Sequence, residues 1–233
     1  MIGYLALARE TFDVEFAESK FSEAKNILES ISTDALGFNQ LITNYDIASQ
    51  ALEFFESNEC EKIFIFQTTF TDAKFILNFT KTINKPICIV SFPEPRTGGR
   101  LRLNSICGLN LGMHSLIKNN ISPDFIIMQS DTKFNKLSFS KFIESSNDNE
   151  NTLWNEATIS NNRSDFNYTI DKQTIGIIGD RPEGFYTCDY DQDEVTDKLN
   201  VSLINLELDD LFDEAKNVNT ETIESTKNTI SVP

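Results

Sequence analysis

The sequence has little histidine, no paired cysteines and no long apolar run. His114 is the single histidine, and the four cysteines are too far apart for the C-x-x-C pairs of zinc and redox sites. Their wide spacing predicts reduced thiols and a cytoplasmic protein. No stretch is apolar over the roughly 20 residues that a transmembrane helix needs, so we expect no membrane partner.

Positive charge is also scarce. The chain has 20 Lys and Arg against 36 Asp and Glu, which gives a net charge of −16 and a sequence pI of about 4.4. A protein that binds the nucleic-acid backbone needs a basic face, so we expect no nucleic-acid partner. The 39% hydrophobic content and 19 Phe nevertheless predict a folded core, and 233 residues suffice for one domain and part of another.

Two nucleotide-binding motifs are missing. The stretch Gly3–Arg9, which spans the first predicted strand and its end, contains no G-x-G-x-x-G fingerprint. The Gly98-Gly99 pair is not followed by the Gly-Lys-Ser/Thr ending of a P-loop. The sequence therefore gives no indication of a nucleotide cofactor.

Short apolar runs alternate with helical stripes through the first 145 residues. Uninterrupted apolar runs suit strands that are buried on both faces of a parallel sheet, and right-handed crossovers between such strands place helices on both faces. We therefore predict an α/β fold with an open, mostly parallel, doubly wound (Rossmann-like) sheet. Its strands are expected at Ile2–Ala8, Asp34–Ile42, Lys62–Gln67, Ile87–Phe92 and Asp124–Met128.

Composition divides the chain into four parts. Residues 1–145 are predicted to form an N-terminal α/β recognition domain, and 146–173 form a polar linker or insertion rich in Asn, Asp, Ser and Thr. Residues 174–216 begin a second α/β domain, and 217–233 form a polar tail. Because two strands do not make a sheet core of normal size, we expect this second α/β domain to be partial.

Polar side chains follow three of the predicted strands. Arg9 follows the first strand, Thr69 the third, and Arg96 and Arg100 the fourth. Ligands of doubly wound sheets bind at the edge where the carboxyl ends of the strands meet, so these four are our candidate substrate-binding residues. The alternative for each is a helix cap or a salt bridge in an ordinary loop, and both interpretations stay open.

The link after the fourth strand concentrates arginine in an otherwise acidic chain. Pro93 and Pro95 end the strand, and a helical stripe is predicted from Leu101. The planar guanidinium group of arginine can donate two parallel hydrogen bonds to carboxylate or phosphate oxygens. The link therefore either binds an oxygen-rich ligand or a neighbour's acidic surface, or is a solvated turn.

No catalytic or metal-ligating residue is assigned. The acidic side chains between Asp180 and Glu194 fit no calcium-loop spacing and are interpreted as a solvated, helix-capping loop. His114 is seven residues from Cys107 on one predicted helix, but no nucleophile motif accompanies it.

Four blocks of the sequence resemble the N-terminal part of the L-fucose isomerase family, which includes the related L-arabinose isomerases. They are Tyr4–Asp13 (YLALARETFD), Gln67–Asp72 (QTTFTD), Glu94–Leu111 and Ile177–Phe185 (IIGDRPEGF). The resemblance implies a cytosolic aldose–ketose isomerase with two N-terminal α/β domains and a C-terminal domain, assembled as a homo-oligomer. It also implies a Mn²⁺ site, but with ligands at the end of the second domain and in the third, so that this chain itself binds no cofactor and is truncated.

In that family a basic residue after the first strand touches the sugar, and Arg9 stands at the matching place. Our hypothesis is therefore the N-terminal part of a sugar isomerase that contributes recognition of a small-molecule sugar and oligomer contacts. The alternative is a non-catalytic sugar-binding or regulatory α/β module.

Overall fold

The computed structural model describes residues 1–145 and 173–230, which form two compact units. The first unit comprises 1–145 together with Glu183–Thr187, and the second comprises 173–182 and 188–230. The predicted linker at 146–173 lies outside the described residues except for Gln173.

The first unit is built on a parallel sheet of five strands with the order β2-β1-β3-β4-β5. The side chains of β3 from Ile63 to Phe66 are fully buried, as expected for a strand covered on both faces. The predicted α/β class with a parallel, doubly wound sheet is confirmed. The strands are β1 (Ile2–Leu7), β2 (Ala35–Ile42), β3 (Lys62–Gln67), β4 (Ile87–Ser91) and β5 (Asp124–Ile127).

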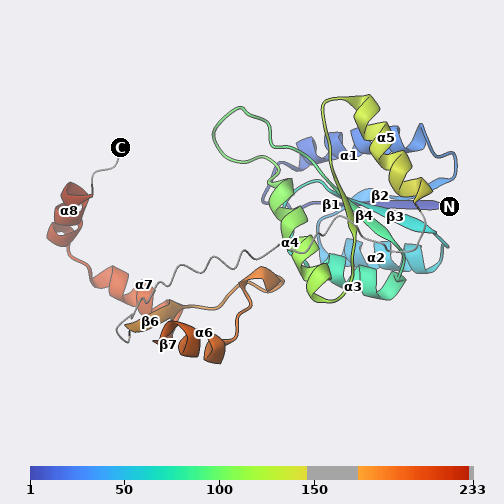
Figure 1. The fold of residues 1–233 in the computed structure, drawn as a ribbon. Coiled ribbons are helices and arrows are strands. Elements are labelled where there is room, and N and C mark those ends of the chain that lie inside the picture. The colour runs from blue at the N-terminus through green and yellow to red at the C-terminus, as the bar shows by residue number, and fades with distance from the viewer. Residues whose placement is uncertain (146–172, 231–233) are drawn as a thin grey trace, which may run out of the picture. The chain divides into compact units, whose positions relative to one another are not determined.

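Helices cover both faces of this sheet (Figure 1). One face is covered by α1 (Val14–Glu29) and α5 (Thr132–Glu144). The other face is covered by α2 (Tyr45–Glu56), α3 (Lys74–Ile83) and α4 (Ser105–Lys118). This division follows from right-handed crossovers in a sheet whose order reverses at β1.

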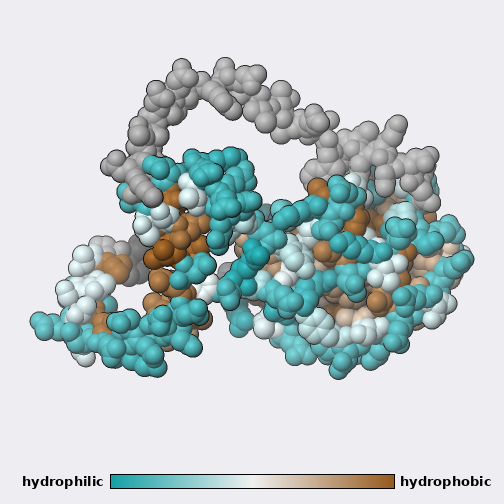
Figure 2. Space-filling model, turned by 90° about the horizontal axis from the view of Figure 1, so that it is seen from below, coloured by the Kyte–Doolittle hydropathy of each residue, from teal (hydrophilic) through white to brown (hydrophobic). Residues whose placement is uncertain are grey.

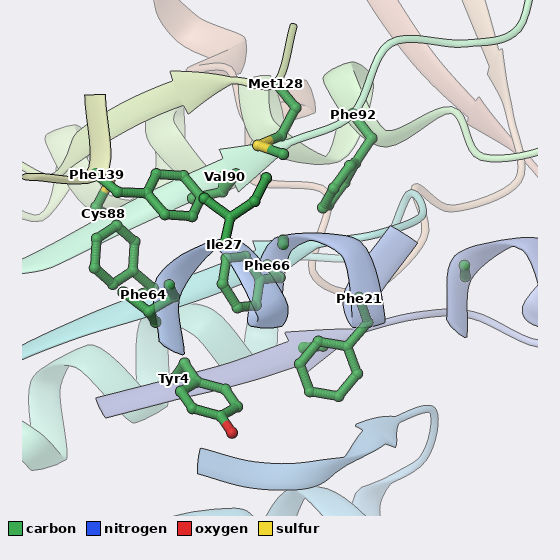
Figure 3. Packing of buried hydrophobic residues seen from close by; sticks show 14 of the residues in the cluster. Tyr4, Phe21, Ile27, Phe64, Phe66, Cys88, Val90, Phe92, Met128 and Phe139 are labelled. Carbon is green, nitrogen blue, oxygen red and sulfur yellow. The ribbon is translucent and has the colours of Figure 1, made fainter. Parts of the chain in front are cut away.

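Aromatic side chains fill the core under α1 and α5 (Figure 3). The ring of Phe64 lies 5.0 Å from that of Phe139, and the ring of Phe66 lies 5.9 Å from that of Phe21. Tyr4 completes the layer, and a Cβ on Gly37 of the neighbouring β2 would lie 2.0 Å from its ring. Glycine at position 37 is therefore required by the close approach of the Tyr4 ring.

The second unit is small. Its two parallel strands, β6 (Gln173–Ile178) and β7 (Val201–Leu206), are joined by a short 3₁₀ turn at Tyr186–Cys188 and by α6 (Gln192–Leu199). Helix α7 (Leu208–Asn217) follows β7. Helix α8 (Thr220–Thr229) forms in the stretch to which the sequence analysis assigned no element.

One face of the β6–β7 pair keeps its apolar side chains exposed. Ile178 and Ile204 are each 47% exposed and Leu206 is 42% exposed. Figure 2 shows apolar side chains gathered on the surface of this unit. Parallel sheets are normally covered on both faces, whereas the described residues leave these side chains exposed, and the partial second α/β domain stays a prediction.

Among the described residues, none of the helices combines the length and the apolar character needed to cross a bilayer.

Candidate functional site

A cavity of ≈ 290 Å³ opens at the carboxyl-terminal edge of the first sheet. It lies among the loops that follow β2, β1 and β3, which are neighbours in the sheet. Its polar lining offers a guanidinium, hydroxyls, an amide and a carboxylate, and its apolar lining includes Leu7, Ile42 and Phe75. The polar residues are Arg9, Thr43, Asn44, Tyr45, Thr71 and Asp72.

Two threonines after β3 hold the Arg9 backbone in place. The hydroxyl of Thr68 donates to the Leu7 carbonyl at 2.6 Å, and the backbone N–H of Arg9 donates to Thr69 Oγ1 at 2.8 Å. Both threonines are fully buried. Two predicted site residues, Arg9 and Thr69, are thus brought together, with the Thr69 hydroxyl bonded to the Arg9 main chain while Arg9 lines the cavity.

The loop between β4 and α4, residues 94–104, is closed at its base by Glu94. The Glu94 carboxylate accepts the backbone N–H groups of Arg102, Leu103 (3.0 Å) and Asn104 (2.9 Å). Partial burial acts to raise the pKa of Glu94, but the three N–H donors outweigh it and the pKa is lowered. In its ionised, carboxylate form Glu94 therefore holds this loop by accepting the three N–H groups.

This loop fills the crevice at which strand order reverses. The Leu103 carbonyl accepts the Phe70 N–H at 2.8 Å, and the Arg102 carbonyl accepts the Asp13 N–H at 3.0 Å. Leu103 is fully buried between the loops that follow β1 and β3. Ligands of doubly wound sheets usually enter at this reversal, but here the chain itself occupies it and the ≈ 290 Å³ cavity lies on the β2 side.

Arg100 and Arg96 lie away from that cavity lining. Arg100 donates from Nη2 to the Thr11 carbonyl at 2.8 Å and borders a second hollow of ≈ 290 Å³ with Thr11 and Asp13. Arg96 is in the outer part of the loop. The structure therefore groups Arg9 with Thr69 and places Arg100 and Arg96 elsewhere on the same edge.

Arg102, which was not among the candidates, anchors the loop to the start of α1. Its guanidinium pairs with Asp13 at 2.8 Å and lies 3.9 Å from the centre of the Phe16 ring. The Phe16 N–H and Arg102 together lower the pKa of Asp13. The Arg102 guanidinium is thus engaged by the Asp13 carboxylate and the Phe16 ring.

The residues after β2 were missed by the sequence analysis. Asn44 caps α2 by accepting the Ile47 N–H at 3.1 Å, and Thr43 and Tyr45 flank it in the cavity wall. The available signal was the polar pair Thr43-Asn44 directly after an apolar run, which is the same signal that selected Arg9 and Thr69.

A manganese site does not fit the described residues. Within 1–145 and 173–230, no group of three or more His, Cys, Asp or Glu side chains gathers closely enough to hold a metal ion. His114 is exposed on α4. No chemical step is therefore derived through a metal held by these residues.

Comparison with known proteins identifies the family. Residues 3–145 match the sequence model of the fucose/sulfoquinovose isomerase N-terminal domain. The chain belongs to this family. The predicted resemblance is thereby confirmed, and the matched residues coincide with the described part of the first unit up to residue 145.

Curated relatives carry the name sulfoquinovose isomerase. The protein of Priestia megaterium is 24% identical over 211 residues, which cover 91% of this chain and 43% of that relative. The protein of Alkalicoccus urumqiensis is 27% identical over 221 residues, 92% of this chain and 44% of the relative. This member of the fucose/sulfoquinovose isomerase family thus spans less than half the length of those relatives.

Proposed function

We propose that the chain is the sugar-recognising N-terminal part of a sugar isomerase and that Arg9 binds the substrate in the cavity beside β1. The observation that carries this proposal is the position of Arg9 in a polar cavity at the sheet edge of a domain that belongs to the isomerase family. Oligomer contacts, a cytoplasmic location and a manganese requirement of the whole enzyme are further parts of the proposal, which the family resemblance implies.

The cavity lining suits a monosaccharide. Thr43, Thr71, Asn44 and Asp72 supply donors and acceptors for sugar hydroxyls, and Phe75 supplies an apolar wall for a C–H face. Its volume of ≈ 290 Å³ is at the lower end of small-molecule sites, which run from about 300 to 1,000 Å³. One sugar unit fits this space, and part of the bound sugar would stay exposed to solvent.

Arg9 favours a sugar that carries a negative charge. A guanidinium forms paired, charge-assisted hydrogen bonds with planar or tetrahedral oxyanions. The two relatives named above carry the name sulfoquinovose isomerase, and sulfoquinovose carries a sulfonate. We therefore assign a sulfonated hexose as the preferred ligand and a neutral deoxyhexose such as L-fucose as the weaker one.

The second candidate is a non-catalytic sugar-binding or regulatory module. In this candidate the chain keeps the recognition domain without a metal-binding one; the lack of a three-ligand metal group among the described residues is expected for both candidates. The coding sequence beyond Pro233 separates the two candidates. An open frame that continues into a domain with Glu and His ligands supports the isomerase, and a stop codon supports the module.

The binding proposal is tested by calorimetry with sulfoquinovose and L-fucose. We expect Arg9→Met to weaken sulfoquinovose binding about 10- to 100-fold, because a hydrogen bond to a charged group contributes about 1.5–3 kcal/mol, and to affect L-fucose less. Arg181→Met is the matched control, since Arg181 pairs with Asp189 in the second unit. If Arg9→Met and the unaltered chain bind sulfoquinovose with equal affinity, the proposed substrate-binding role of Arg9 is wrong.

A further inference from the structure

Residues Glu183–Thr187, which we call the strap, belong to the first unit although the chain on both sides of them belongs to the second. The Phe185 ring lies 5.5 Å from the Phe70 ring. Phe185 and Tyr186 pack against the apolar cluster under α2, α3 and α4. The strap is therefore integrated into the first unit by its side chains.

Gly184 lies against the start of α3. Its carbonyl accepts the Ala73 N–H at 3.2 Å, while the Asp72 carboxylate accepts the next helix N–H, that of Lys74, at 3.0 Å. The strap thus satisfies one of the N–H groups that a helix start leaves without an intrahelical partner.

Only glycine fits at position 184. Its φ is +82°, in the left-handed region, and a Cβ there would lie 2.8 Å from Asp72 Cβ and 2.9 Å from Asp72 Oδ1. The Asp72 side chain, which lines the cavity, is therefore in direct contact with the strap backbone.

A second set of contacts connects the strap to Tyr45. Glu183 pairs with Lys74 Nζ at 2.6 Å, and the same ammonium lies 5.2 Å from the centre of the Tyr45 ring. Tyr45 begins α2, which follows β2, whereas Asp72 lies in the loop after β3, and both line the cavity. The strap thus contacts one polar cavity residue and reaches another through Lys74.

We propose that the docked strap positions Asp72 and Tyr45 for ligand binding, so that strap docking and sugar binding at the cavity are thermodynamically coupled. Gly184 is the main positioning residue. This inference rests on the proposed function of the cavity. Because such coupling is reciprocal, the sugar stabilises the docked strap to the same extent as the docked strap strengthens sugar binding.

The experiment compares Gly184→Ala with Gly179→Ala in the full chain. Gly179 has a similar φ of +72°, but a Cβ there meets only ordinary contacts, the nearest at 3.5 Å from Leu208 Cβ. Both variants strain the backbone alike, and only the first clashes with Asp72. Phe185→Ala, which removes the ring contact with Phe70, releases the strap without backbone strain.

Sulfoquinovose affinity by calorimetry and amide hydrogen exchange of peptides covering 70–77 are the two readouts. Gly184→Ala and Phe185→Ala are expected to bind about tenfold more weakly and to exchange faster at Ala73 and Lys74. Gly179→Ala is expected to match the unaltered chain in both. Added sulfoquinovose should slow exchange in 183–187.

The outcomes separate this inference from the proposed function. If the unaltered chain binds no sulfoquinovose, the proposed function fails and the coupling fails with it, while the exchange data still decide whether the strap docks. If the unaltered chain binds and Gly184→Ala binds equally well despite faster exchange at 70–77, the cavity is a sugar site and the coupling is wrong.

Discussion

Lys62 is a buried cation whose partners are main-chain oxygens and the Ser145 hydroxyl at the end of α5. It is 5% exposed, and its ammonium donates to the carbonyls of Phe142 at 2.6 Å and Ile143 at 3.0 Å and to Ser145 Oγ at 2.9 Å. Burial lowers the pKa of Lys62, with nearby Asp124 acting in the opposite direction. Lys62 therefore closes a helix end, where positive charge is favourable.

We expect Lys62→Met to lower the free energy of unfolding by about 2–3 kcal/mol, because buried carbonyls at the α5 terminus lose their donor. The measurement is urea unfolding followed by circular dichroism. Lys20→Met, which removes a more exposed lysine paired with Glu23, is the control and should change stability by no more than about 0.5 kcal/mol. Equal losses in the two variants would contradict the capping role.

At the residue scale, the sequence predicted that Arg9 and Thr69 lie at the carboxyl-terminal edge of the sheet. It did not predict the hydrogen bond between them. The hydrogen bond between them joins residues 60 apart in the chain, and the bonds of Lys62 to α5 join residues 80 or more apart. Local patterns report strand ends and caps, whereas such pairings depend on which strands become neighbours. The substrate-binding role of Arg9, Thr69, Arg96 and Arg100 stays a prediction.

At the scale of elements, the sequence predicted the strands and helices well and the loop at 94–104 less well. Helix α4 begins at Ser105 rather than at Leu101. The reason is that Glu94 takes the N–H groups of Arg102, Leu103 and Asn104, and Asn104 adopts a left-handed φ of +51°. An apolar stripe could not reveal this, because Leu103 is buried in the sheet crevice instead of on the helix.

Glu94 gives this loop a dependence on pH. Its pKa is lowered in the folded chain from the usual value of 4.5, so the stabilisation it provides is present above 4.5 and is lost as pH falls through the folded pKa. We expect the amide resonances of Arg102, Leu103 and Asn104 to titrate together in NMR spectra, with a midpoint below 4.5. In Glu94→Gln this shared titration should disappear. Its persistence in that variant would assign it to another group.

At the scale of the whole molecule, continuous apolar runs were sufficient to predict a parallel sheet, since strands covered on both faces leave that pattern. The order β2-β1-β3-β4-β5 is set by long-range pairing and was not readable from the runs. For the same reason the sequence could not show that the loop around Leu103 fills the reversal crevice, or that the strap belongs to the first unit.

We expect the 233-residue chain by itself not to isomerise sugars when Mn²⁺, Mg²⁺ or Co²⁺ is added. Metal-assisted isomerisation needs several carboxylate and imidazole ligands fixed around an ion that keeps positions open for the sugar. No group of three such side chains gathers in 1–145 or 173–230. Sulfoquinovose binding at Arg9 without ketose formation is therefore the expected combination.

The assay measures ketose formation from sulfoquinovose, L-fucose and L-arabinose with the purified chain and each metal, beside a chelator-treated control. Binding by calorimetry is measured on the same preparation, so that an inactive chain is distinguished from an unfolded one. Metal-dependent turnover that the chelator abolishes would contradict the prediction. The acidic and imidazole side chains of the chain would then have to be tested as ligands, and Asp180, Glu183 and His114 would be the first to substitute.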